Sequence, residues 1–170
     1  MSDTIARVAA ALNGVPHRFV LAPDGLLTVE VEREHLRATL VALKSQAGFE
    51  ANTFVTAVDH YPAKPRYELC YQFLSYANND RVRVHTLVNE DQATVPTITD
   101  LWPGTSFSER ECFDMFGIVF EGHPDLRRLL MPQGFEHHPL RKDFPHHGIE
   151  PERLYRTWDR ERRKDWNPAS

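Results

Sequence analysis

The stretch FEHHPLRKDFPHH, residues 135–147, holds four histidines together with charged side chains, which are residue types that can bind a metal. A catalytic metal site needs three or four converging ligands, and paired histidines usually supply them one helical turn apart. Here the members of each pair are adjacent, so in an extended segment they point to opposite sides. Arg141 and Lys142 would also repel another cation. Solvated or partner-facing histidines are therefore favoured over a metalloenzyme, whose ligands would be His123, His138 and His146.

Three carboxylates at Glu109, Glu111 and Asp114 are the second candidate, because such groups serve as general acids and bases. No nucleophile accompanies them: Cys112 falls on the apolar side of the same predicted helix, where a thiol tends to be inert. The sequence also lacks a G-x-S-x-G motif and the glycine spacings that bind phosphate. Arg110 stands four residues before Asp114 and is expected to pair with it. Taken locally, these charges indicate a solvated helix face or a structural contact rather than catalysis.

A helix over residues 106–116 must position these charges. Ser106 and Glu109 have the spacing of a capping box, and Gly117 suits the end of the helix. Apolar side chains share one side of it and predict contact with a core. They are Cys112, Phe113, Met115 and Phe116.

Prolines and turn formers dominate the chain after this helix. A short helix is expected to begin near Asp125 and to end before Pro132. Prolines at 139, 145 and 151 predict an extended, stiffened segment over residues 132–151. Residues 153–170 mix charges of both signs and predict a surface helix or a tail that a partner orders.

The chain before residue 95 shows helical and strand periods in alternation. Helices are expected over residues 3–13 and 33–48, with strands over 26–32, 52–61, 66–77 and 81–90. The turn formers at 78–80 predict that the last two strands form an antiparallel hairpin. The fold class is therefore α+β, with helices packed on a mostly antiparallel sheet, followed by an extended proline-rich C-terminal segment.

Three regions follow from this pattern. Residues 1–95 form the α+β core, and residues 96–131 hold the charged helix and complete the same domain. The turn-rich stretch at 91–104 is expected to be a linker between them. Residues 132–170 are expected to form an extended strap and tail that become ordered only against partner subunits.

Composition excludes several classes of function. The 170 residues are 41% hydrophobic, enough for one core, and carry a net charge of -4, so a nucleic-acid partner is not expected. Cys70 and Cys112 are too few for an iron-sulfur cluster or a cysteine-only zinc site, and both are expected to be reduced, as in a cytosolic protein. No apolar run long enough to span a membrane and no signal peptide is recognised.

The segment ERECFDMFGIVFEGHPDLRRLL, residues 109–130, resembles the characteristic motif of the 30-kDa subunit family of respiratory complex I, also known as the C-type subunit of NADH-quinone oxidoreductase. The flanking stretches VPTITDLWPGTSF and HPLRKDFP resemble the family as well, so the likeness covers roughly residues 95–145. The matching motif positions are Glu109, Arg110, Glu111, Asp114, Phe116, Gly117, His123, Pro124 and Leu129.

This resemblance implies a cofactor-free structural subunit in the hydrophilic arm of a proton-translocating complex, on the cytoplasmic side of the bacterial plasma membrane. Flavin and iron-sulfur clusters are expected in neighbouring subunits. The expected partners are the 49-kDa-type (D-type) subunit and the iron-sulfur subunits beside it, with membrane contact through the complex. The homologous subunit of a membrane-bound hydrogenase or of another quinone or ferredoxin dehydrogenase stays an alternative.

The resemblance also turns the charges of the motif into an expected interface or structural network. Arg141, Lys142 and Asp143 suit docking on an acidic surface, since an arginine can form a bidentate carboxylate pair. His137 stands where the family usually has glycine, and the chain ends sooner than many members, which puts the contacts of their tails in question. The network residues are Glu109, Arg110, Glu111, Asp114, His123, Arg128, His138, Arg141, Lys142 and Asp143.

Overall fold

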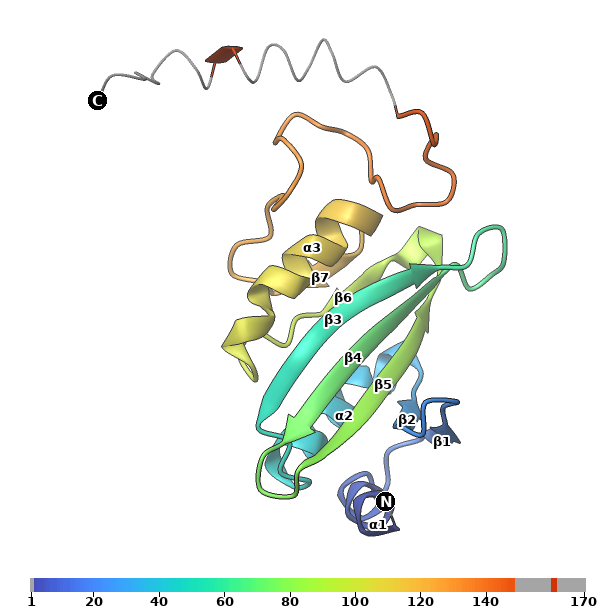
Figure 1. Ribbon diagram of the computed structural model, residues 1–170, viewed down its shortest axis with the longest axis vertical. Coiled ribbons are helices and arrows are strands. Elements are labelled where there is room, and N and C mark those ends of the chain that lie inside the picture. The colour runs from blue at the N-terminus through green and yellow to red at the C-terminus, as the bar shows by residue number, and fades with distance from the viewer. Residues whose placement is uncertain (1, 149–159, 162–170) are drawn as a thin grey trace, which may run out of the picture.

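The computed structural model describes residues 2–148 and 160–161, in which a sheet is accompanied by three helices (Figure 1). The helices are α1 (Ser2–Ala11), α2 (Arg33–Ser45) and α3 (Ser106–Phe116). The strands are β1 (Arg18–Leu21), β2 (Leu27–Glu30), β3 (Ala51–Asp59), β4 (Tyr67–Ser75), β5 (Asp80–Val88), β6 (Thr94–Pro96) and β7 (Val119–Glu121).

Five strands form the main sheet in the order β1-β2-β5-β4-β3. Within this sheet the β2–β5 pair is parallel and the other pairs are antiparallel, so the predicted α+β class with a mostly antiparallel sheet is confirmed. The predicted hairpin is β4–β5, whose turn places Asn79 at φ 49°. Strand β1 was not predicted.

The core lies on one face of the sheet. Alternate residues of β4 point into it, and four of them, Tyr67, Leu69, Tyr71 and Phe73, are fully buried. Helix α2 contacts β5 and lies behind β4 and β5 in Figure 1, whereas α3 runs along β3. Cys112 of α3 is buried here and donates to the Val55 carbonyl, at 3.7 Å from sulfur to oxygen.

The stretch expected to be a linker belongs to the packed structure. It contributes β6, which pairs in parallel with β7, and α3 makes the crossover between these two strands. Val95, Ile98 and Trp102 are buried in the same core cluster, and the Trp102 ring lies 4.6 Å from that of Phe73.

Two local expectations fail. Residues 125–131 form turns rather than a helix. Ser106 is the first residue of α3 instead of its cap, and the side chain of the N-cap residue, Thr105, makes no capping hydrogen bond. His137 does not adopt a positive φ, so its place at a family glycine position causes no backbone strain. Gly117 ends α3 in the left-handed region, as predicted.

The prolines after α3 stand in turns and irregular structure up to residue 148. The predictions for the tail fall largely on residues 149–159 and 162–170, outside the described residues. Within the described part of the chain, no helix is long and apolar enough to cross a membrane.

Candidate functional site

Helix α3 holds two carboxylates whose side chains are fully buried, and each binds a different segment of the chain. Glu109 accepts a hydrogen bond from the Ile98 amide at 2.8 Å and from the Thr97 hydroxyl at 2.5 Å. Burial raises the pKa of Glu109, and these two hydrogen bonds only partly oppose that effect. Glu109 therefore fixes the turn that follows β6.

Asp114 binds the segment that follows β7. One carboxylate oxygen accepts hydrogen bonds from the amides of Leu129, Leu130 and Met131 at 3.0, 2.7 and 2.8 Å, and the other accepts from Arg128 Nη1 at 2.7 Å. Burial by itself would raise the pKa of Asp114, but the three amides and Arg128 together lower it. Because three successive amides point at one anion, residues 125–131 cannot make helical hydrogen bonds.

Arg110 does not pair with Asp114, contrary to the prediction from their spacing. Its guanidinium donates to the carbonyls of Arg127 and Arg128, at 3.1 Å each, and lies over the Phe107 ring. Glu111 is exposed and takes no part in these contacts. The charges predicted to form one network on α3 therefore bind three different sets of partners, one each for Glu109, Asp114 and Arg110.

His123 connects the turn after β7 to the start of α3. Its Nε2 lies 3.1 Å from the Ser106 hydroxyl, and its Nδ1 accepts a hydrogen bond from the Asp125 amide at 3.0 Å. The Ser106 hydroxyl therefore contacts His123 and does not form the predicted capping box with Glu109.

The segment HPLRKD, residues 138–143, covers the C-terminal end of α3, and we name it the box. The last carbonyls of a helix have no partner within the helix. Here His138 Nδ1 donates to the Asp114 carbonyl at 2.9 Å, the Leu140 amide to Met115 at 3.1 Å, and Arg141 Nε to Phe116 at 2.6 Å. Three successive carbonyls are thereby satisfied by residues more than twenty positions later in the chain.

The close fit of the box depends on Gly117. This glycine has φ +79°, and a Cβ placed on it would lie 2.5 Å from Arg141 Nη2 and 2.6 Å from His138 Nε2. Burial lowers the pKa of His138, and the nearby Arg141 adds to that effect. His138 is therefore neutral at pH 7, with its proton on Nδ1 facing the carbonyl.

The other end of the box joins a buried ion cluster formed by Asp59 and Arg66. The Arg66 guanidinium donates to both Asp59 oxygens at 3.0 and 2.9 Å, to Asp143 at 2.7 Å and to Glu90 at 2.7 Å. The Lys142 amide donates to Asp59 at 2.8 Å. Although burial opposes it, Arg66 and the backbone amides lower the pKa of Asp59 to about 2.

Asp59 and Arg66 were missed by the sequence analysis, although one signal for Asp59 was present. Along β3, Val55 and Ala57 face the core, and Asp59 continues that alternation onto the same face. A carboxylate in that register needs a buried partner. Arg141 lies over the Tyr67 ring, donates to a carbonyl, and places Nη1 3.8 Å from Glu90 Oε1 of the same chain. Its pairing with a partner carboxylate stays a prediction.

The three histidines of the metalloenzyme hypothesis are not brought together as a ligand set. His123 and His138 bind different parts of α3, and His146 is exposed in a turn. Within residues 2–148 and 160–161, a metal-ligand grouping is formed by Glu68, Cys70 and His85 on the main sheet.

These contacts define a class of protein: a small α+β domain whose motif charges join chain segments to one another. Residues 29–150 match the family model described as respiratory-chain NADH dehydrogenase, 30 kDa subunit. The chain belongs to this family, as the resemblance indicated.

Individual relatives agree with this assignment. The chain is 43% identical to the C subunit of NADH-quinone oxidoreductase of Sinorhizobium medicae, over 85% of this chain and 74% of that protein. It is 53% identical to the C subunit of Roseiflexus castenholzii over 52% of this chain, and the match spans about half (51%) of that relative's length. The chain is thus a homologue of the C subunit of NADH-quinone oxidoreductase.

Two solved structures share the fold. A trypsin-resistant fragment of Nqo5 is 31% identical with a TM-score of 0.66, over 72% of this chain and 99% of that one. A chain of an archaeal membrane-bound sulfane sulfur reductase complex has a TM-score of 0.73 at 22% identity, over 98% of this chain and 93% of that one. The second likeness concerns the fold alone.

Proposed function

We propose that this chain is a structural subunit of the peripheral arm of a proton-translocating NADH-quinone oxidoreductase and holds no redox cofactor of its own. It packs against the 49-kDa-type (D-type) subunit, and neighbouring iron-sulfur subunits transfer the electrons from NADH to quinone. The complex holds it at the cytoplasmic face of the bacterial plasma membrane. The names of its relatives, which are C subunits of NADH-quinone oxidoreductase, support this proposal.

The observation that supports a structural role most directly is the use made of the charged residues. Asp114, with all of its partners supplied by residues 128–131, has no free oxygen for an acid-base reaction. Arg66 likewise directs its donors to three carboxylates of the same chain. Groups that are fully engaged in this way hold segments together, which suits a subunit that presents a fixed surface.

Exposed apolar side chains around α3 and the box are proposed to contact the partner. Phe107, Leu130 and Leu140 are 64%, 63% and 53% exposed, and each lies on α3 or on a segment that α3 binds. Large apolar side chains exposed in this way are typical of protein interfaces. We propose that these three residues, with the exposed Glu111 and Lys142 at the rim, meet the 49-kDa-type subunit.

Purification of a tagged chain from solubilised membranes tests the assignment. The 49-kDa-type subunit and iron-sulfur subunits with NADH-quinone activity are the expected companions. Recovery with a hydrogenase large subunit would instead support the alternative that the motif leaves open. Recovery of the chain alone, with a bound transition metal and hydrolytic activity, would overturn both in favour of the histidine metalloenzyme.

Substitution at the box tests the interface. Leu140→Glu is expected to lower the amount of assembled complex on native gels while leaving the urea midpoint of the isolated chain unchanged, because the side chain faces solvent. Tyr76→Glu is the matched control, since this exposed residue follows β4 at the end remote from the box. Equal assembly of the two variants would count against this surface.

Asp114→Ala separates assembly from catalysis. It removes four hydrogen bonds from the segment after β7, so the assembled amount should fall while turnover per assembled complex stays near the wild-type value. Arg110→Ala should act in the same direction, because it releases two carbonyls of that segment. Normal assembly with lost turnover would contradict the structural role.

A further inference from the structure

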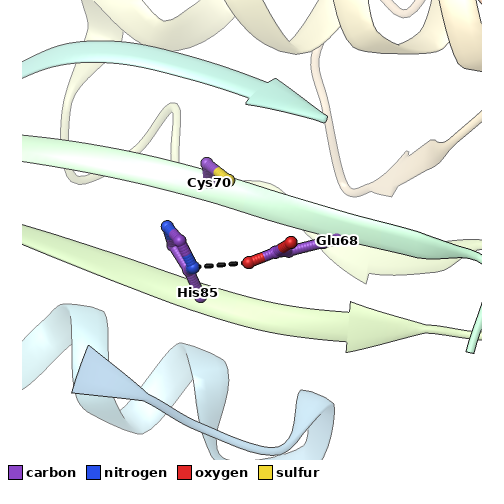
Figure 2. Close-up of side chains that lie close together, drawn as sticks. All are labelled: Glu68, Cys70 and His85. Atoms are coloured by element: carbon purple, nitrogen blue, oxygen red, sulfur yellow. Dashed lines mark ion pairs between the residues drawn. The ribbon is translucent and has the colours of Figure 1, made fainter. Parts of the chain in front are cut away.

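The face of the sheet turned away from the core carries a cluster of possible metal ligands. Glu68 and Cys70 are two residues apart on β4, so both point to this face, and Cys70 stands directly opposite His85 on β5. One ligand atom from each of the three lies within 4.8 Å of the others. Figure 2 shows these side chains over the paired strands, with Glu68 and His85 joined as an ion pair.

The cluster is polar and largely shielded from solvent. Glu68 contacts His85 Nδ1 with one oxygen at 2.5 Å and His60 Nε2 with the other at 2.7 Å. The second ring nitrogen of His85 is buried and has no hydrogen-bond partner in the described part of the chain. A buried polar atom left without a partner is destabilising, so the His85 ring is not fully satisfied by the described residues.

We propose that Glu68, Cys70 and His85 bind a divalent ion of the zinc class, with His60 holding the Glu68 carboxylate in place. A thiolate, an imidazole and a carboxylate are the donors that Zn²⁺ takes, and harder ions such as Mg²⁺ avoid sulfur. Three protein ligands leave a fourth position open. A cavity of about 860 Å³ is lined by both Glu68 and His85.

The neighbouring charges do not oppose this ion strongly. Arg83 is a cation on the same face, two residues before His85, and its guanidinium is paired with Asp24 at 2.7 Å. The contact between His60 and Glu68 is of the kind that orients metal ligands from behind.

A reactive thiol is the weaker interpretation of Cys70. Burial, helped by the Glu68 charge, raises the pKa of Cys70 to about 12, so the free thiol stays protonated and is a poor nucleophile. A bound metal ion would displace that proton, as it does for other cysteine ligands. The metal site lies on the open sheet face and is independent of the proposed assembly role.

Titration of the purified full chain with Co²⁺, followed by displacement with Zn²⁺, tests the site. One Co²⁺ per chain is expected, with the near-ultraviolet absorption of a thiolate bound to cobalt. Cys70→Ala should lose this absorption, whereas Cys112→Ala should keep it, because Cys112 is on α3 and buried against β3. Glu68→Gln and His85→Gln should each weaken binding, and His60→Ala should weaken it about 10- to 100-fold.

Thermal unfolding gives a second readout that does not depend on absorption. Zn²⁺ should raise the Tm of the wild-type chain and of Cys112→Ala but not that of Cys70→Ala, since only an ion bound to the folded state stabilises it. Wild-type protein that binds no stoichiometric Co²⁺ overturns the site without any variant. Absorption that survives in Cys70→Ala, or vanishes in Cys112→Ala, overturns it too.

Discussion

Gly117→Ala is expected to destabilise the domain strongly, because this glycine meets two demands at once. Its φ of +79° lies in the left-handed region, which costs a residue with a Cβ about 1–2 kcal/mol. The added methyl would also lie 2.5 Å from Arg141 Nη2, so Arg141 must move and give up its hydrogen bond to the Phe116 carbonyl. A hydrogen bond to a charged group contributes about 1.5–3 kcal/mol. The total loss should be about 2.5–5 kcal/mol.

Gly48→Ala is the matched control. Gly48 follows helix α2 with φ +67°, but a Cβ there would meet nothing within 4 Å. It should therefore cost only the backbone strain, about 1–2 kcal/mol. Urea unfolding of the isolated chain, followed by fluorescence and circular dichroism, gives both values.

The difference between the two variants measures the contact with the box. In an Arg141→Ala background, Gly117→Ala should lose much of its extra cost, because the side chain that it displaces is absent. Equal losses for Gly117→Ala and Gly48→Ala in the wild-type background would refute the docking of the box on α3.

Three further predictions concern the ion cluster and the box. Arg66→Ala should cost about 3–5 kcal/mol in urea unfolding because it leaves buried Asp59 unpaired, whereas Arg18→Ala, from an exposed pair, should cost less than about 1 kcal/mol. The pKa of Asp59 is about 2 in the folded chain and about 3.9 in the unfolded chain, so its ionised form contributes about 2.5 kcal/mol to the free energy of unfolding. This contribution is complete above about pH 4 and is lost as the pH falls through about 2. Measuring stability against pH in acid should show this loss in the wild type and not in Asp59→Asn. Amide exchange should be slow at Leu140 in the isolated chain, and fast exchange there would restore the expectation that the whole of residues 132–170 is ordered only by partners.

Elements with a clear period were predictable, and contacts between distant segments were not. Helix α3 was predictable from its helical spacing of apolar residues, and strands β3 to β5 from alternating apolar and polar residues. Gly117 indicated where the helix ends. The sequence predicts Asp114 on the polar, exposed side of its helix, because nothing in the helix itself covers that side. In the structure, residues 128–131 pack against this side and bury Asp114. Those same amides, once bound to Asp114, removed the short helix expected after Asp125.

The candidate site was partly predictable for the same reason. The motif pointed to Asp114, Arg128 and His138, but it gave no pairing among them. Arg66 and Asp143 are 77 residues apart, and only the folded sheet brings them together. An ion pair between residues this far apart leaves no periodic signal in the sequence, so the sequence does not indicate which charged residues pair.

The box also sets an order of events during synthesis. The Lys142 amide reaches Asp59 across 83 residues, and the end of α3 receives its last donors only from residues 138–141. A nascent chain that has released α3 but not yet residue 143 therefore exposes Arg66 and three helix carbonyls without their final partners. A message truncated in this interval would yield a domain that lacks these closing contacts between α3, Asp59 and the box.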